Sequence, residues 1–215
     1  ELWNVKTDTT FVKSQQKLSI VIINNNIIFS NSIGDISAVD SDTGDLIWQT
    51  PTQDSSIYQS AFELKTSTLV SNSKVLLFSN NKNQFFSIDA NNGILNWQQK
   101  VNSNIRPEII DGLIFTVTLE GFLIVIENKT GNIIRITNIF DRFKEKKRSK
   151  IKPIGFEIGT EKIYLTTDNG FLIVINLLDG KSLSMIKIDN KKISKPFINN
   201  KNLYIIKDNS IIRLN

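Results

Sequence analysis

Short hydrophobic runs alternate along the whole chain with turn-forming residues. Between residues 107 and 138 the runs read PEIIDG, LIFTVTLE, GFLIVIEN and GNIIRITN, and each is bounded by Gly, Asn or Asp. Runs of this length, rich in Ile, Val and Phe, predict β-strands joined by tight turns. No segment keeps a helical spacing over about a dozen residues, so the pattern does not predict alternating strands and helices.

The strand pattern is repeated. GFLIVIENKTG (121–131) returns as GFLIVINLLDG (170–180), and related copies are GDISAVDSDTG (34–44), NQFFSIDANNG (83–93) and a truncated NSIIRLN (209–215). The first residues of the copies are 49, 38, 49 and 39 positions apart. Four strands in a repeat of about 40 residues are typical of a β-propeller blade. We therefore predict an all-β chain that forms a single propeller domain over 1–215, or a portion of one, with about four complete blades and partial terminal ones.

The glycines of the repeat mark a turn. GFLIVI predicts a strand with aliphatic residues on both faces, as expected between neighbouring blades. The acidic or amide residue that ends the strand can accept hydrogen bonds from backbone N–H groups ahead of it, and Gly adopts positive φ without steric cost. A phosphate-binding loop is not supported, because no helix and no Lys-Ser/Thr pair follow. The predicted turn residues are Asp40, Gly44, Asp89, Gly93, Gly131 and Gly180.

The first copy carries a specific motif. Residues 38–48, AVDSDTGDLIW, resemble the tryptophan-docking repeat A-x-D-x-x-T-G-x-x-x-W of PQQ-type (quinoprotein-like) β-propellers. The second copy keeps Asp, Gly and Trp, the third keeps Thr-Gly but has Arg135 at the Trp position, and the fourth has lost the Trp. The resemblance implies that the indoles wedge between blades and perform no reaction, which suits large aromatic rings. The docking residues are Trp3, Trp48 and Trp97.

Within this family the chain is most similar to the BamB group of outer-membrane assembly factors, which are periplasmic lipoproteins without enzymatic activity. The resemblance implies a non-catalytic scaffold that binds protein partners in the periplasm. It implies at most a peripheral attachment to the outer membrane, through a lipid anchor that has been removed from this sequence. It also implies that the last blade borrows its fourth strand. Two arrangements stay open: ELWNV (1–5), which has the composition of a strand, closes a small five-bladed ring with 200–215, or the chain is the C-terminal portion of a larger propeller.

Composition narrows the chemistry. The chain has no cysteine and no histidine, so thiolate catalysis, Ser-His-Asp hydrolysis and the usual zinc sites are excluded. Its apolar runs are far shorter than the ~20 residues of a membrane helix. We expect no enzyme activity, cofactor, metal or small-molecule substrate. The alternative is a quinoprotein dehydrogenase with PQQ, calcium and a carboxylate base, but Asp40, Asp89 and Glu127 lie at fixed turn positions and no cluster of acids is evident.

The net charge of +5 comes from one segment. Residues 141–152, DRFKEKKRSKIK, hold a surplus of five positive charges. Phe143 and Ile151 are expected to anchor the segment while its cations face an acidic partner. A solvated linker is the alternative, and nucleotide bias also explains abundant Lys. Nucleic-acid binding is a weaker hypothesis, because no aromatic stacking platform accompanies the charge. The predicted binding residues are Arg142, Phe143, Lys144, Lys146, Lys147, Arg148, Lys150 and Lys152.

Overall fold

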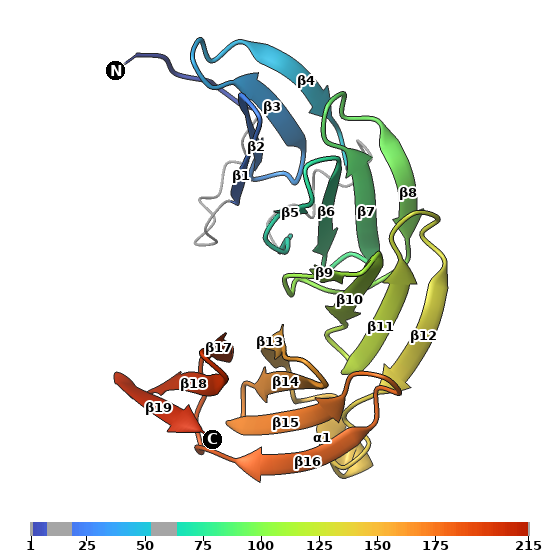
Figure 1. Cartoon of the computed structure of the whole chain (residues 1–215), viewed down its shortest axis with the longest axis vertical. Helices are drawn as coiled ribbons and strands as arrows, with labels where there is room; N and C mark the ends of the chain where they lie inside the picture. Colours follow the sequence, from blue (N-terminus) through green and yellow to red (C-terminus); the bar gives the residue numbers. More distant parts are fainter. Residues whose placement is uncertain (1, 8–18, 53–63, 215) are drawn as a thin grey trace. The chain divides into compact units, whose positions relative to one another are not determined.

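The computed structural model describes residues 2–7, 19–52 and 64–214, which form an all-β chain (Figure 1). The described strands build four antiparallel sheets of four strands and one of three, and in every sheet each strand lies beside the next one along the chain. This arrangement confirms the predicted four-stranded repeats. The last repeat contains three strands, as its truncated sequence indicates.

The first two sheets belong to a compact unit formed by Glu1–Ile109 and Lys129–Gly131. The strands of the first sheet are β1 (Ile20–Ile23), β2 (Asn26–Ser30), β3 (Ile36–Asp40) and β4 (Leu46–Thr50). Those of the second sheet are β5 (Val70–Ser71), β6 (Val75–Asn80), β7 (Gln84–Asp89) and β8 (Leu95–Gln99).

A second compact unit is formed by Ile110–Asn128 and Asn132–Asn215. The strands of the third sheet are β9 (Glu108–Ile110), β10 (Leu113–Val117), β11 (Phe122–Glu127) and β12 (Ile133–Asn138). The short helix α1 (Glu145–Arg148) precedes the fourth sheet, which contains β13 (Pro153–Ile158), β14 (Lys162–Thr167), β15 (Phe171–Asn176) and β16 (Ser182–Lys187). The last sheet contains β17 (Phe197–Asn199), β18 (Asn202–Lys207) and β19 (Ser210–Leu214).

Within each unit, a buried hydrophobic cluster lies between two neighbouring sheets. In the first unit one buried cluster joins Ile28 and Ile36 of the first sheet to Phe78 and Phe86 of the second, and the rings of Phe78 and Phe86 stack with centroids 4.9 Å apart. Phe85, which precedes Phe86 in β7, is also fully buried. Successive residues of a strand point to opposite faces, so β7 is buried on both sides, as predicted for a strand between two neighbouring blades.

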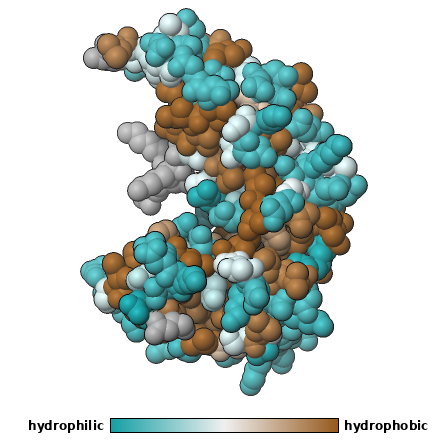
Figure 2. All heavy atoms as spheres, viewed as in Figure 1, coloured by the Kyte–Doolittle hydropathy of each residue, from teal (hydrophilic) through white to brown (hydrophobic). Residues whose placement is uncertain are grey.

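The first sheet also has an exposed hydrophobic face. Ile20 and Ile22 of β1 are 64% and 69% exposed, and hydrophobic residues gather over β1 and β2 in Figure 2. Val21, which lies between them in β1 and points to the opposite face, packs against the core cluster. The two faces of β1 therefore differ in burial.

A register shift recurs between the third and fourth strands of each complete sheet. It falls between Ala38 and Val39 in the first sheet, and at the equivalent positions in the others, Ser87/Ile88, Val125/Ile126 and Val174/Ile175. Such a bulge increases local twist, so the outer strand bends away from the inner ones. The repeat therefore encodes the shape of the sheet as well as its turns.

The prediction that ELWNV is a strand is wrong for its described residues. Leu2, Trp3, Asn4 and Val5 belong to no strand, and Glu1 lies outside the described residues. The segment instead makes its contact through a side chain, because the Trp3 indole lies on the turn at Gly44. The family resemblance implied the contact made by Trp3, whereas the composition of the segment wrongly predicted a strand.

An ion pair joins the last two sheets. The Lys207 ammonium at the end of β18 lies 2.7 Å from the Asp189 carboxylate, which follows β16. The hydrogen bond from Lys207, assisted by the Lys191 backbone N–H, lowers the pKa of Asp189 to about 2 from its ordinary 3.8. The same hydrogen bond raises the pKa of Lys207. Asp189 is therefore charged at all but strongly acidic pH.

This pair predicts an acid-labile contact. Because the pKa of Asp189 is lower in the folded state, its stabilisation is complete above pH 3.8 and is lost as pH falls towards about 2. We expect Asp189→Asn to lower the thermal midpoint at pH 6 and to leave it nearly unchanged at pH 2, measured by circular dichroism. Asp179→Asn, which changes a more exposed ion pair, serves as the control. A similar loss for Asp189→Asn at both pH values would contradict this prediction.

Candidate protein-binding segment and docking turns

The turn that follows the third strand of the first sheet is held by an aspartate. Asp40 Oδ1 accepts hydrogen bonds from the backbone N–H of Asp42 and Thr43, at 2.8 and 2.9 Å. Both hydrogen bonds lower the pKa of Asp40, and the bond from Thr43 has the larger effect. Gly44 then adopts a φ of 77°. The carboxylate is thus occupied as a hydrogen-bond acceptor in the turn.

The same turn recurs in the later sheets. The Oδ1 atom of Asp89 accepts from the two backbone N–H groups that follow it at Asn91 and Asn92, and the amide of Asn176 does so in the fourth sheet. The closing glycines have φ values between 74° and 77° and are Gly44, Gly93, Gly131 and Gly180. Only a residue without Cβ adopts this conformation at little cost.

An indole lies against three of these glycines, all within the first unit. A Cβ built on the glycine would approach a ring atom to 2.5–2.7 Å, closer than any real contact, so a side chain at that position would displace the ring. The pairs are Trp3 with Gly44, Trp48 with Gly93 and Trp97 with Gly131. The Trp3 Nε1–H also donates to the Ser41 carbonyl at 3.1 Å. Tryptophan and glycine therefore form complementary halves of each contact.

The structure adds a second contact that the motif does not contain. Two residues after Trp48, the Thr50 hydroxyl donates to the Gly93 carbonyl at 2.5 Å. Two residues after Trp97, the Gln99 amide donates to the Gly131 carbonyl at 2.7 Å. Positions i and i+2 share one face of a strand, which is the only signal that sequence offers for this pairing.

In the second unit an arginine occupies the docking position. The motif alone marks Arg135 as a departure, yet its guanidinium donates to the carbonyls of Leu177, at 3.0 Å, and Leu178. Thr137, two residues later, lies against Gly180, where an added Cβ would be 2.7 Å from its hydroxyl. Arg135 therefore contacts the next turn by hydrogen bonds where Trp does so by ring packing.

The basic segment 141–152 connects β12 to β13 and is packed onto the second unit. Phe143 is 8% exposed and Ile151 4%. The Phe143 ring contacts Phe140 and Phe171 edge-to-face, with centroids 5.5 and 5.3 Å apart. Aromatic pairs prefer this geometry. The anchoring expected of Phe143 and Ile151 is thus present in the fold.

The two arginines of the segment bind main-chain carbonyls. Arg142 Nη2 donates to Ser182 and Leu183 of β16 at 2.7 and 3.0 Å. Arg148 donates from Nε to Phe143 at 3.0 Å and from Nη2 to Asp141 at 2.7 Å. The sequence interpretation grouped both with the outward-facing cations. In the structure Arg142 binds the segment to β16, and Arg148 binds carbonyls of the segment itself.

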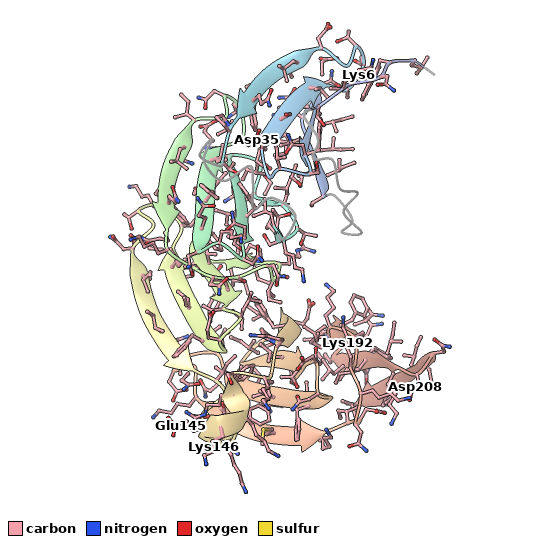
Figure 3. All side chains as sticks on the ribbon, turned by 180° about the vertical axis from the view of Figure 1, so that it is seen from behind. Lys6, Asp35, Glu145, Lys146, Lys192 and Asp208 are labelled. Atoms are coloured by element: carbon pink, nitrogen blue, oxygen red, sulfur yellow. The ribbon has the colours of Figure 1, made fainter. Side chains whose placement is uncertain are left out.

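The lysines of the segment face outward. All five side chains are exposed, and Figure 3 shows Glu145 and Lys146 on the outer side of α1. Asp141 and Glu145 are the acidic residues of the segment. We call this set the lysine segment: Lys144, Lys146, Lys147, Lys150 and Lys152.

The acidic residues of the turns do not gather into a metal site. Asp40 and Asp89 each serve a different turn. Among the residues that the structure describes, no group of three or more Asp or Glu side chains could hold one metal ion. Within the same described ranges, no helix is long and apolar enough to cross a membrane.

Solved structures with a similar fold include β-propellers. BamB from Moraxella catarrhalis aligns with a TM-score of 0.68 at 14% identity over 91% of this chain and 62% of that one. The Cps50 (Swd1) β-propeller domain of Myceliophteria thermophila gives 0.67 at 10% identity over 90% and 62%. The computationally designed protein Ika8 gives 0.59 at 11% identity over 93% and 71%. The chain thus has a β-propeller fold and spans 62% of the BamB structure's length.

Sequence comparison places the chain within a particular propeller family. A family model described as outer membrane protein assembly factor BamB matches residues 1–137, so the chain belongs to this family of PQQ-type propellers. No curated protein matches the chain in sequence. The match includes the repeats that carry Trp48 and Trp97.

Proposed function

We propose that this chain is a non-catalytic, periplasmic protein-binding propeller that acts in outer-membrane protein assembly and binds an acidic segment of a protein partner. Its membership of the BamB family supports this role. The observation that supports this binding site is that different residues of 141–152 anchor the segment and face the solvent. Phe143 and the two arginines hold the segment in place, while the lysine segment is left exposed.

The chemistry of the lysine segment favours an acidic protein surface. Five ammonium groups lie within nine residues of sequence, with only Glu145 of opposite charge between the first and last of them. A local field of one sign attracts an oppositely charged partner and raises its association rate, and salt weakens the effect. Because the backbone is anchored, the lysines lose less conformational freedom on binding than they would in a free linker.

Neutralising the lysine segment tests this proposal. We expect the variant with all five lysines changed to glutamine to bind a blocked decaglutamate peptide at least about tenfold more weakly at low salt. Exposed ion pairs contribute roughly 0.2–1 kcal/mol each, and about 1.4 kcal/mol corresponds to tenfold in affinity. The salt dependence of binding, measured by fluorescence anisotropy, should also flatten. A photo-crosslinker at Lys147 should label a subunit of the purified outer-membrane assembly machinery.

A matched variant separates position from total charge. Exposed lysines elsewhere provide the same change in net charge, and we choose Lys65, Lys74, Lys100, Lys129 and Lys192. If both glutamine variants lose affinity equally, or neither does, the lysine segment is not the binding site. Stronger binding to a DNA oligonucleotide than to the peptide would favour nucleic acid as the partner instead.

A further inference from the structure

The second unit contains a concave site at the other end of β13 from the lysine segment. Its volume is about 360 Å³, and its rim is formed by the turns that join β13 to β14 and β17 to β18. The six residues of β13 separate the two sites by about 20 Å at the usual rise of a strand. The lining residues are Gly159, Thr160, Glu161, Lys162, Tyr164, Ile198, Lys201, Asn202 and Leu203.

The floor of this site includes hydrophobic side chains. Leu203 belongs to the buried cluster between the last two sheets, and Tyr164 and Ile198 pack against that cluster while remaining partly accessible. Gly159 adjoins both, because a Cβ at that glycine would lie 3.4 Å from the Tyr164 ring and 3.5 Å from the Ile198 methyl. The floor therefore offers an aromatic ring and two aliphatic side chains to a hydrophobic group.

The rim of the site is charged. Glu161, Lys162 and Lys201 are all exposed, and the net charge of the three is positive. Within the described part of the chain, neither lysine forms an ion pair. Their ammonium groups are thus available to an anionic group placed above the floor.

Lys201 has a backbone conformation that folding alone does not favour. The β17–β18 turn places Asn200 at a φ of 48° and Lys201 at 64°. In two-residue hairpin turns of this kind Asn followed by Gly is the favoured pair, because glycine has no Cβ to clash. A lysine in this turn brings an ammonium group to the rim of the site.

We propose that this concave site binds an extended peptide of a protein partner, which inserts one large hydrophobic side chain and places an adjacent carboxylate beside Lys162 and Lys201. A volume of about 360 Å³ lies at the low end of ligand pockets, so it suits one such side chain better than a whole cofactor. The neighbouring β17 is one of the two edge strands of its sheet, and an extended chain can align along such an edge. This site goes beyond the function proposed for the lysine segment.

The test uses the full chain in which the lysine segment has been changed to glutamine, so that acidic peptides cannot bind there. Three end-blocked peptides are titrated by amide NMR: Gly-Asp-Phe-Asp-Gly, Gly-Lys-Phe-Lys-Gly and Gly-Asp-Ala-Asp-Gly. We expect the first to shift the amides of Gly159, Ile198 and Leu203 in a saturable way. The other two should bind at least about tenfold more weakly, because each lacks the charge or the hydrophobic side chain.

Lys201→Gly separates binding from folding. Glycine fits the positive φ, so the thermal midpoint should hold or rise, while the affinity for Gly-Asp-Phe-Asp-Gly should fall about fivefold through the lost charge. Asn209→Gly changes a residue at a φ of 62° in the β18–β19 turn and should leave affinity unchanged. Lys162→Gln provides a second variant that does not alter a turn. Equal affinity of both lysine variants and the parent, or shifts confined to other residues, would overturn the proposal.

Discussion

Replacing Trp48 by alanine is expected to lower the free energy of unfolding by about 2–4 kcal/mol. Truncation of a buried Trp costs about 3–5 kcal/mol, and Trp48 is 8% exposed and lies against Gly93. Part of this loss is offset, because the Trp48 Nε1–H is buried with no hydrogen-bond partner among the described residues, and an unpaired buried donor costs roughly 1–3 kcal/mol. The packing loss is the larger effect, so the net change is destabilising.

The experiment is urea denaturation followed by far-ultraviolet circular dichroism. Trp48→Phe keeps an aromatic ring on Gly93 and removes the unpaired N–H, so its loss of stability should be under about 1.5 kcal/mol, because it removes much less buried volume than Trp48→Ala. Trp97→Ala, at a half-buried equivalent position, should be intermediate. If Trp48→Phe were as harmful as Trp48→Ala, ring packing would not be the origin of the stability.

The second large effect is expected at Phe143. Phe143→Ala should destabilise the second unit by roughly 3 kcal/mol, within the usual range for a buried Phe, because it removes the edge-to-face contacts with Phe140 and Phe171. It should also weaken decaglutamate binding, since the lysine segment would no longer be held in one conformation. Amide hydrogen exchange of residues 141–152, with peptide anisotropy on the same sample, measures both effects.

Two further variants make this prediction specific. Phe143→Leu retains most of the buried volume and should recover much of the stability and the affinity. Phe122→Ala removes a ring that is 37% exposed and should cost far less. Intact affinity in Phe143→Ala, despite faster exchange of the segment, would show that anchoring is not needed for binding.

The repeat could be predicted from sequence because its determinants are local. The Asp40 turn is complete within five residues, from the acceptor carboxylate to the glycine at positive φ. The strand pattern that includes Phe85 and Phe86 likewise needs only neighbouring residues to be recognised. Spacing was therefore enough to predict the blades and the turn glycines, while the docking role of Trp48 was implied by the family resemblance.

The sequence did not predict the contacts that a side chain makes with residues far away along the chain. Arg135 contacts Leu177, 42 residues away, so its motif position gives no indication of the carbonyls that it binds. Arg142 and Lys144 look alike as charges, but the arginine donates hydrogen bonds to two carbonyls of β16, whereas the lysine is exposed. A guanidinium presents several donors in a plane, whereas an ammonium is readily left in water.

The amino-acid sequence by itself determined the all-β repeat, the tight turns and the cationic character of 141–152, because each depends on residue type and spacing over a few positions. Only the tertiary structure decided which cations are consumed by internal hydrogen bonds, that Asp189 pairs with Lys207, and that Tyr164 and Ile198 meet beneath Lys201. Apart from the bonds of Arg148, which stay within 141–152, these contacts join residues that are far apart in the sequence. Their geometry exists only after the sheets have packed, so no local pattern encodes it.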